Sequence, residues 1–215
     1  MEKVSVLYSK IGVIKKSISI DDLIKKLPLD LQKQNLAYLH EQDRFAHAIS
    51  RLLLVKLLDK FTQKNSNFLS NLKFNSHQKP YFDLNFHFNI SHSGDYVLCA
   101  ASKAANLGID IEKKRALEIH GFEDLFTSLE WQDITTAQNP AIFFDYWSKK
   151  ESIIKADGRG LGVDLKSILI QNNRATLENQ AYYLFPLFID KDYSAHLCTQ
   201  NHEIQIEISY FDTLV

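Results

Sequence analysis

The sequence predicts a globular protein that combines α-helices with short β-strands. Apolar residues recur every three or four positions over 41–62, which is typical of a helix with one buried face. Residues 84–91 alternate between apolar and polar side chains, and the turn signal Ser93-Gly94-Asp95 leads into a second strand at 96–101, as in a β-hairpin. Two more helical patterns, at 121–137 and 141–157, follow a short strand pattern at 107–112.

The remaining segments are shorter and less regular. Residues 4–20 alternate weakly and predict one or two strands, whereas the polar, Asn-rich stretch 62–79 predicts a loop. Pro140 suits a break between the two later helices or the first turn of the second. Three glycines end that helix, and four short strands are predicted beyond them, at 166–171, 181–189, 193–199 and 203–210. No internal repeat is visible, and a boundary between two parts fits best at 103–106.

Composition restricts the class of protein. The 215 residues suffice for one sizeable domain or two small ones, and a formal net charge of −1 gives no bulk basicity for nucleic acid. Cys99 and Cys198 lie far apart in apolar stretches and predict buried thiols in a reducing compartment. The N-terminus lacks a signal-peptide pattern, and no apolar run reaches the ~20 residues of a membrane span. We therefore expect a cytoplasmic protein.

Two carboxylates share one face of the strand predicted at 107–112. Because strand side chains alternate, Ile109 and Ile111 should face the core, whereas Asp110 and Glu112 point the other way, with Gly108 leaving open space beside them. Two adjacent carboxylates repel each other, and a divalent cation such as Mg²⁺ relieves that repulsion. A solvated strand face is the plainer alternative.

A third acid interrupts the apolar stripe of the helix at 141–157. Phe144, Trp147 and Ile154 lie on one stripe, and Glu151 occupies a core position within it. A buried carboxylate needs a cation. Lys155, four residues on, supplies one as a helical salt bridge; alternatively Glu151 is a third Mg²⁺ ligand and Lys155 meets a phosphate.

Polar and basic residues in the first half offer donors to a phosphate. Asn89-Ile90-Ser91-His92-Ser93-Gly94 closes the hairpin with hydroxyl, imidazole and backbone N–H groups, although these groups can also satisfy their own turn. Adjacent Ser and His without a G-x-S-x-G elbow argue against hydrolase chemistry. Arg44, Arg51 and Lys79 are further candidates, although a residue of this kind, taken singly, is more often a surface charge.

In order and spacing these segments resemble the 4′-phosphopantetheinyl transferase superfamily, in particular its monomeric, surfactin-synthetase-activating type. The family pattern G-I/V-D-x-E reads Gly108-Ile109-Asp110-Ile111-Glu112, and W/F-S-x-K-E-x-x-x-K reads Trp147 to Lys155, with 38 residues between Glu112 and Glu151. The N-x-S-H-S block lies at 89–93, and Lys79-Pro80 matches a K-P element in which the usual preceding glycine is Gln78. The resemblance extends from about Asp43 to Leu161.

The resemblance implies an α+β pseudo-dimer of two similar subdomains, 1–104 and 105–215, each a small antiparallel sheet packed with a long helix. It also implies transfer of the phosphopantetheine arm of coenzyme A to a serine of an apo acyl or peptidyl carrier protein, releasing 3′,5′-ADP. Asp110, Glu112 and Glu151 would hold Mg²⁺, and Asp110, Glu151 and Lys155 would be catalytic, with Glu151 as ligand, base or both. Arg44, Lys79, Ser91, His92 and Lys155 would bind coenzyme A, with Arg51 a weaker candidate.

Two other functions remain open at this stage. One is a different magnesium phosphoryl- or nucleotidyl-transfer enzyme, although no G-x-x-x-x-G-K-[ST] loop is present. The other is a non-catalytic module that binds coenzyme A or a carrier protein. We expect a monomer with no membrane or nucleic-acid partner, and neither the carrier nor a preference for free over acylated coenzyme A can be read from the sequence.

Overall fold

The computed structural model describes residues 1–104, 106–137 and 139–212, which form two compact units. The first unit comprises Met1–Ala104 together with the C-terminal segment from Glu203, and the second follows residue 104 and ends at His202. We had expected the second part to run to the C-terminus. The last strand, β11 (Ile204–Tyr210), instead belongs to the first unit because it pairs in parallel with β1 (Glu2–Lys10).

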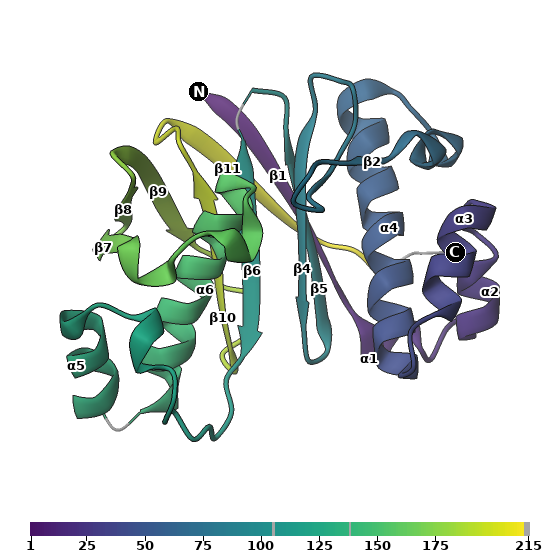
Figure 1. Ribbon diagram of the computed structural model, residues 1–215. Coiled ribbons are helices and arrows are strands. Elements are labelled where there is room, and N and C mark those ends of the chain that lie inside the picture. Colours follow the sequence, from purple (N-terminus) through teal and green to yellow (C-terminus); the bar gives the residue numbers. More distant parts are fainter. Residues whose placement is uncertain (105, 138, 213–215) are drawn as a thin grey trace. The chain divides into compact units, whose positions relative to one another are not determined.

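The first unit is a four-stranded sheet with α4 packed on one of its faces (Figure 1). The strand order is β11-β1-β5-β4, and the antiparallel hairpin of β4 and β5 is the predicted one. The predicted long helix is also confirmed, as α4. The other elements of this unit are shorter: α1 (Ile11–Ile14), α2 (Ile20–Ile24), α3 (Leu29–Leu36), α4 (Glu41–Thr62), η1 (Ser66–Asn71), β2 (Lys73–Phe74), β3 (Pro80–Tyr81), β4 (His87–Ser93) and β5 (Tyr96–Ser102).

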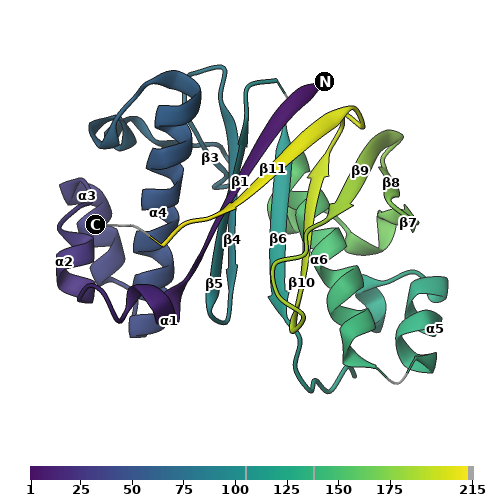
Figure 2. The same ribbon diagram turned by 180° about the vertical axis from the view of Figure 1, so that it is seen from behind.

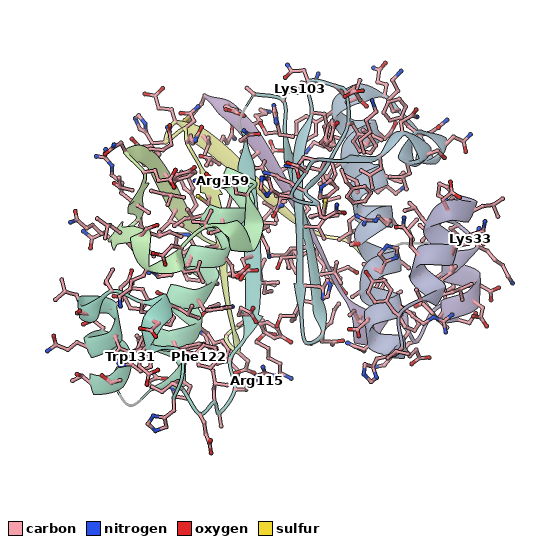
Figure 3. All side chains as sticks on the ribbon, in the orientation of Figure 1. Lys33, Lys103, Arg115, Phe122, Trp131 and Arg159 are labelled. Atoms are coloured by element: carbon pink, nitrogen blue, oxygen red, sulfur yellow. The ribbon has the colours of Figure 1, made fainter. Side chains whose placement is uncertain are left out.

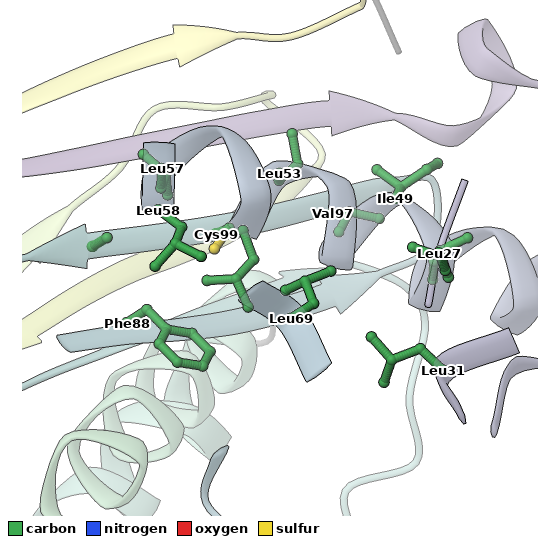
Figure 4. Packing of buried hydrophobic residues seen from close by; sticks show 14 of the residues in the cluster. Leu27, Leu31, Ile49, Leu53, Leu57, Leu58, Leu69, Phe88, Val97 and Cys99 are labelled. Carbon is green, nitrogen blue, oxygen red and sulfur yellow. The ribbon is translucent and has the colours of Figure 1, made fainter. Parts of the chain in front are cut away.

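The core of this unit lies between α4 and the hairpin. Leu53, Leu57 and Leu58 of α4 are fully buried and belong to one cluster with Phe88, Val97 and Cys99 of the sheet (Figure 4). The one or two strands expected within 4–20 are present as the single strand β1, which is followed by α1. The backbone N–H groups of Ile11 and Gly12 donate to the carbonyl and the carboxylate of Asp95, which turns the chain away from the sheet.

The second unit is a five-stranded sheet in the order β6-β10-β9-β8-β7, with α6 packed on β6 and β10 (Figure 2). The paired strands of this sheet are antiparallel. The first of the two predicted helices begins later than expected, because Thr127 and Glu130 form a capping box at its start. Its elements are β6 (Leu107–Lys113), η2 (Glu123–Leu125), α5 (Ser128–Thr136), α6 (Pro140–Asp157), η3 (Gly160–Gly162), η4 (Leu165–Ser167), β7 (Leu169–Gln171), β8 (Arg174–Leu177), β9 (Gln180–Pro186) and β10 (Tyr193–Thr199).

The two units repeat one topology, although the sequence shows no repeat. In each, a first strand is followed by a long helix and then by an antiparallel hairpin. The second strand of that hairpin lies between the other two, giving β1-β5-β4 in one unit and β6-β10-β9 in the other. The expected α+β fold of two subdomains is therefore present. No helix of the described residues is long and apolar enough to cross a membrane.

Gly108 sets the distance between α6 and β6. A Cβ atom at this position would collide with the carbonyl oxygen of Ser152 and the backbone nitrogen of Ala156, and it would lie 3.0 Å from the carbonyl carbon of Lys155. The space that we expected beside Gly108 is thus filled by helix backbone. Glycine lets the helix touch the strand directly, one pleat away from Asp110.

We predict that Gly108→Ala lowers the free energy of unfolding by about 3 kcal/mol, because backbone rather than a flexible side chain opposes the new methyl group. Urea unfolding measures the change. Gly162→Ala is the matched control, since nothing lies within 4 Å of a Cβ there, and its effect should stay within about 0.5 kcal/mol. Equal effects of the two variants would contradict the close contact.

A buried ion pair joins α6 to α5. The ammonium nitrogen of Lys150 lies 2.9 Å from Glu130 Oε2, and the side chains are 0% and 5% exposed. The same ammonium donates to the carbonyl oxygens of Leu165 and Ile168, while Glu130 accepts from the backbone N–H of Thr127. Burial lowers the pKa of Lys150, and Glu130 opposes that shift. Charges this deeply buried are tolerated only because each has a partner.

Lys150→Met should lower the free energy of unfolding by about 3–5 kcal/mol, because it leaves the Glu130 carboxylate buried without its cation. The double variant Lys150→Met/Glu130→Gln should recover most of the loss, since Gln keeps the capping geometry without the charge. Urea unfolding of both variants provides the measurement. If the double variant is no more stable than the single one, the cost does not come from the uncompensated carboxylate.

Candidate active site

Asp110 of β6 is at the centre of the predicted acidic site. Its side chain is 3% exposed, which excludes the solvated strand face for this residue. Ile109 and Ile111 are fully buried on the other face, as predicted, and Glu112, two residues on, is half-buried. Alternation along the strand places Asp110 and Glu112 on the face against which α6 packs.

Lys155 of α6 forms an ion pair with Asp110. Its Nζ lies 2.5 Å from Asp110 Oδ1, whereas the sequence had left open whether Lys155 pairs with Glu151 or meets a phosphate. The side chains of Glu151 and Lys155, both on α6, nevertheless interact with Asp110 on β6. Burial raises the pKa of Glu151, the positive charge of Lys155 lowers it, and the negative charge of Asp110 raises it further. The structure therefore brings Asp110, Glu151 and Lys155 into one electrostatic group within the second unit.

The donor set of this group has the hard-oxygen chemistry that Mg²⁺ prefers. Asp110 and Glu112 supply neighbouring carboxylates from one strand, and Glu151 supplies a third whose ionisation is opposed by Asp110. Within residues 1–104, 106–137 and 139–212 the side chains form no group of three close enough to hold a metal. The residues fit the ion by the type of their ligand atoms, Asp110 raises the pKa of Glu151, and Lys155 already neutralises Asp110.

A buried histidine that the sequence did not reveal links β10 to α6. His196 lies directly opposite Asp110 in the pairing of β10 with β6. Its Nδ1 is 2.7 Å from the hydroxyl oxygen of Ser148, and its Nε2 is 3.6 Å from Asp145 Oδ1. A lone His inside an apolar strand pattern carries no signal, because only the pairing register places it beside the acid. Burial lowers the pKa of His196 to about 4.

We predict that acid destabilises the protein between pH 6.5 and pH 4. In this window the unfolded chain binds a proton at His196 that the folded chain excludes, so stability falls as the pH is lowered, by up to about 3 kcal/mol. His196→Gln should reduce the slope of the urea midpoint against pH, and exposed His120→Gln should not. His47 also has a pKa lowered to about 4, so part of the slope of the urea midpoint against pH should remain in His196→Gln. An unchanged slope would contradict a neutral buried imidazole.

The serine–histidine segment of the first unit lies on β4. Ser91 is buried and pairs with Leu98, whereas the neighbouring His92 is exposed. Burial lowers the pKa of His47, and its electrostatic interactions with Arg51 and with His92 lower that pKa further. His47 is hydrogen-bonded to Asn35 at 3.1 Å. His47 and Arg51 belong to α4, so this helix and the end of the hairpin hold a group of cationic or protonatable side chains.

The other basic candidates of the first unit differ in their surroundings. Arg44 is held by Asp21 of α2, with 3.4 Å between Arg44 Nη2 and Asp21 Oδ1. Arg51 has a buried Nε for which the described residues provide no hydrogen-bond partner, and burial lowers its pKa. Lys79 follows Gln78, which adopts φ 64°, a left-handed conformation that glycine takes without strain.

Comparison with known protein families agrees with this arrangement. The family described as "4′-phosphopantetheinyl transferase superfamily" matches residues 106–208, and "4′-phosphopantetheinyl transferase, N-terminal" matches residues 18–104. The first match contains the acidic site, and the second contains the serine–histidine segment. The chain belongs to the 4′-phosphopantetheinyl transferase superfamily.

Individual members of the superfamily show the same relationship. The chain is 35% identical over 147 residues to the 4′-phosphopantetheinyl transferase gsp of Aneurinibacillus migulanus, covering 66% of this chain and 61% of the relative. It is 30% identical over 133 residues to Sfp of Bacillus subtilis, covering 57% and 59%. With ffp of Bacillus subtilis it shares 26% identity over 204 residues, covering 88% and 89%. The matched part thus spans about three fifths of the first two relatives.

Proposed function

We propose that this protein transfers the 4′-phosphopantetheine arm of coenzyme A to a serine hydroxyl of an apo acyl or peptidyl carrier protein, with release of 3′,5′-ADP. The observation that carries the proposal is the group formed by Asp110, Glu151 and Lys155, which belong to two different elements of one unit. The relatives are named 4′-phosphopantetheinyl transferases. The motifs of the superfamily and the observed group thus coincide.

A magnesium ion would be held by Asp110, Glu112 and Glu151. When bound, Mg²⁺ neutralises the charge of a pyrophosphate and of its leaving group. We assign the remaining steps of the reaction to side chains of the protein. Glu151 has a carboxylate whose pKa is raised by burial, which suits it to accept the proton of the serine hydroxyl. The ammonium of Lys155, one-quarter exposed, stabilises phosphate oxygens, and Asp110 orients it.

Two sets of residues are assigned to coenzyme A. We assign Ser91, His92, Lys79 and Arg44 to its 3′-phosphate, because hydroxyl, imidazole and cationic donors suit a dianion. Arg51 is added to this set on the strength of its buried Nε. Lys155 would meet the pyrophosphate. We also propose that the protein is a cytoplasmic monomer whose macromolecular partner is the carrier, with no membrane or nucleic-acid partner.

Intact mass spectrometry of an apo carrier incubated with the protein, coenzyme A and Mg²⁺ tests the function. We expect a gain equal to one phosphopantetheine group that disappears with EDTA. Asp110→Asn and Glu151→Gln should each reduce the rate at least about 100-fold. Because burial already disfavours the charge of Glu151, Glu151→Gln should be as stable as the parent protein or more so.

Exposed Glu118→Gln is the matched control and should retain full activity. A loss of activity in Glu151→Gln that is accompanied by a loss of stability would indicate a structural role for this acid. Binding of coenzyme A without transfer to fatty-acid, polyketide and peptide carriers would support a non-catalytic binding module. Transfer of another nucleotide's phosphoryl group in its place would support a different phosphoryl-transfer enzyme.

A further inference from the structure

His196 of β10 lies beside the acidic site and has no part in the proposed chemistry. It is 3% exposed and lies directly opposite Asp110 in the pairing of β10 with β6. Side chains of directly paired residues project from the same face of a sheet, so His196 and Asp110 are both on the face that packs against α6. An imidazole is more costly to bury than an apolar side chain, so its partners should account for its presence here.

Both nitrogen atoms of the imidazole face residues of α6. Nδ1 is 2.7 Å from the hydroxyl oxygen of Ser148, and Nε2 is 3.6 Å from Asp145 Oδ1. A nearby carboxylate favours the hydrogen on Nε2, which leaves Nδ1 to accept a hydrogen bond from the Ser148 hydroxyl. The same hydroxyl has an alternative acceptor within the helix, the carbonyl oxygen of Asp145 at 3.3 Å. The bond to His196 is therefore not needed to satisfy Ser148, and its effect is to join the helix to the sheet.

Two fixed points on α6 lie on either side of Glu151. The first is Ser148, which is bonded to the residue opposite Asp110. The second is Ser152, whose carbonyl oxygen would collide with a Cβ atom at Gly108. Four residues of helix rise about 6 Å, and the two residues of strand from Asp110 to Gly108 rise about 6.8 Å, so the two contacts fit one another in height. The turn that carries Glu151 is thus held at both of its ends.

Lys155 is held independently of the contact at His196. The backbone of Lys155 belongs to the close contact at Gly108, and its ammonium pairs with Asp110. Loss of the bond between His196 and Ser148 should therefore loosen the turn of Glu151 at one end and leave Lys155 in place. The two functional side chains of α6 can be separated by experiment on this basis.

We propose that His196 is a positioning residue, which holds Glu151 in place for Mg²⁺ through its hydrogen bond to Ser148. The inference rests on the proposed function, in which Glu151 is a ligand of the ion. The imidazole acts through the helix, because both of its nitrogen atoms face α6. Groups that orient a metal ligand in this way commonly alter metal affinity and rate when they are removed.

Calorimetric titration of the protein with Mg²⁺ in the presence of coenzyme A, without a carrier, tests this role alongside the transfer rate. His196→Leu removes the acceptor and keeps a buried side chain of similar size. It should weaken Mg²⁺ and lower kcat, each at least about tenfold, and leave the KM for coenzyme A within about twofold at saturating Mg²⁺. His196→Asn, whose Oδ1 takes the place of Nδ1, should recover both values to within about threefold of the parent protein.

Ser148→Ala removes the other half of the same hydrogen bond and should match His196→Leu. The double variant should bind Mg²⁺ no more weakly than either single variant, because one and the same bond is lost in all three. Ile168→Val is the matched control for general destabilisation, since Ile168 is fully buried in the same unit. It should lower the urea midpoint and leave Mg²⁺ affinity and kcat within about twofold.

Unchanged Mg²⁺ affinity and kcat in His196→Leu would overturn the positioning role. Equal losses in Ile168→Val, or no recovery in His196→Asn, would overturn it as well, because the effect would then come from reduced stability alone. If the parent protein transfers phosphopantetheine in those cases, the proposed function stands without this role. A parent protein that neither binds Mg²⁺ with coenzyme A nor transfers phosphopantetheine would overturn both.

Discussion

The backbone contact between α6 and β6 is the constraint on which the acidic site depends. Only a residue without a Cβ fits at Gly108, where the helix backbone touches the strand. This contact brings Lys155 to within 2.5 Å of Asp110, and it places Glu151 where the charge of Asp110 alters its ionisation. If α6 lay further from β6, Asp110 and Lys155 could not neutralise each other. The charge of Asp110 would then be buried without a partner and would destabilise the fold strongly.

A second set of polar contacts determines how α6 is rotated and how far it slides along the sheet. Lys150 is anchored to Glu130 and to two carbonyl oxygens, while Ser148 bonds to His196 on β10. Apolar packing alone tolerates small shifts of a helix, whereas short hydrogen bonds between buried groups do not. Beyond the end of α6, Arg159, which is labelled in Figure 3, forms ion pairs with Asp157 and Glu178. These partners hold the helix at several points along its length.

The sequence was sufficient where chemistry follows from local spacing. Strand alternation put Asp110 with Glu112, and the position of Glu151 on an apolar stripe marked an acid that had to be compensated. It was insufficient where the answer depends on distant segments. The choice of Asp110 over Glu151 as the partner of Lys155, the role of His196 and the pairing of Lys150 with Glu130 all require the packing of α6.

Local patterns also failed for small elements and for long-range strand pairing. Helices α2 and α3 have five and eight residues, too few for a clear period, and β8 has four. The parallel pairing of β11 with β1 joins the two ends of the chain, so no local pattern assigns residues 204–210 to the first unit. Gln78 is a related case, because the sequence showed only that the usual glycine is replaced and did not show that the backbone there has a positive φ.

The shared topology of the two units makes their difference in charge informative. The long helix of the first unit carries His47 and Arg51, and that of the second carries Glu151 and Lys155. The group around α4 is cationic or neutral, and burial lowers the pKa of both His47 and Arg51. The group around α6 includes the acids Asp110 and Glu151, and Lys155 pairs with the first and lowers the pKa of the second. The same architecture thus presents one helix, α4, that is suited to anions and one helix, α6, that is suited to a cation. Recognition of a pyrophosphate substrate together with Mg²⁺ requires both.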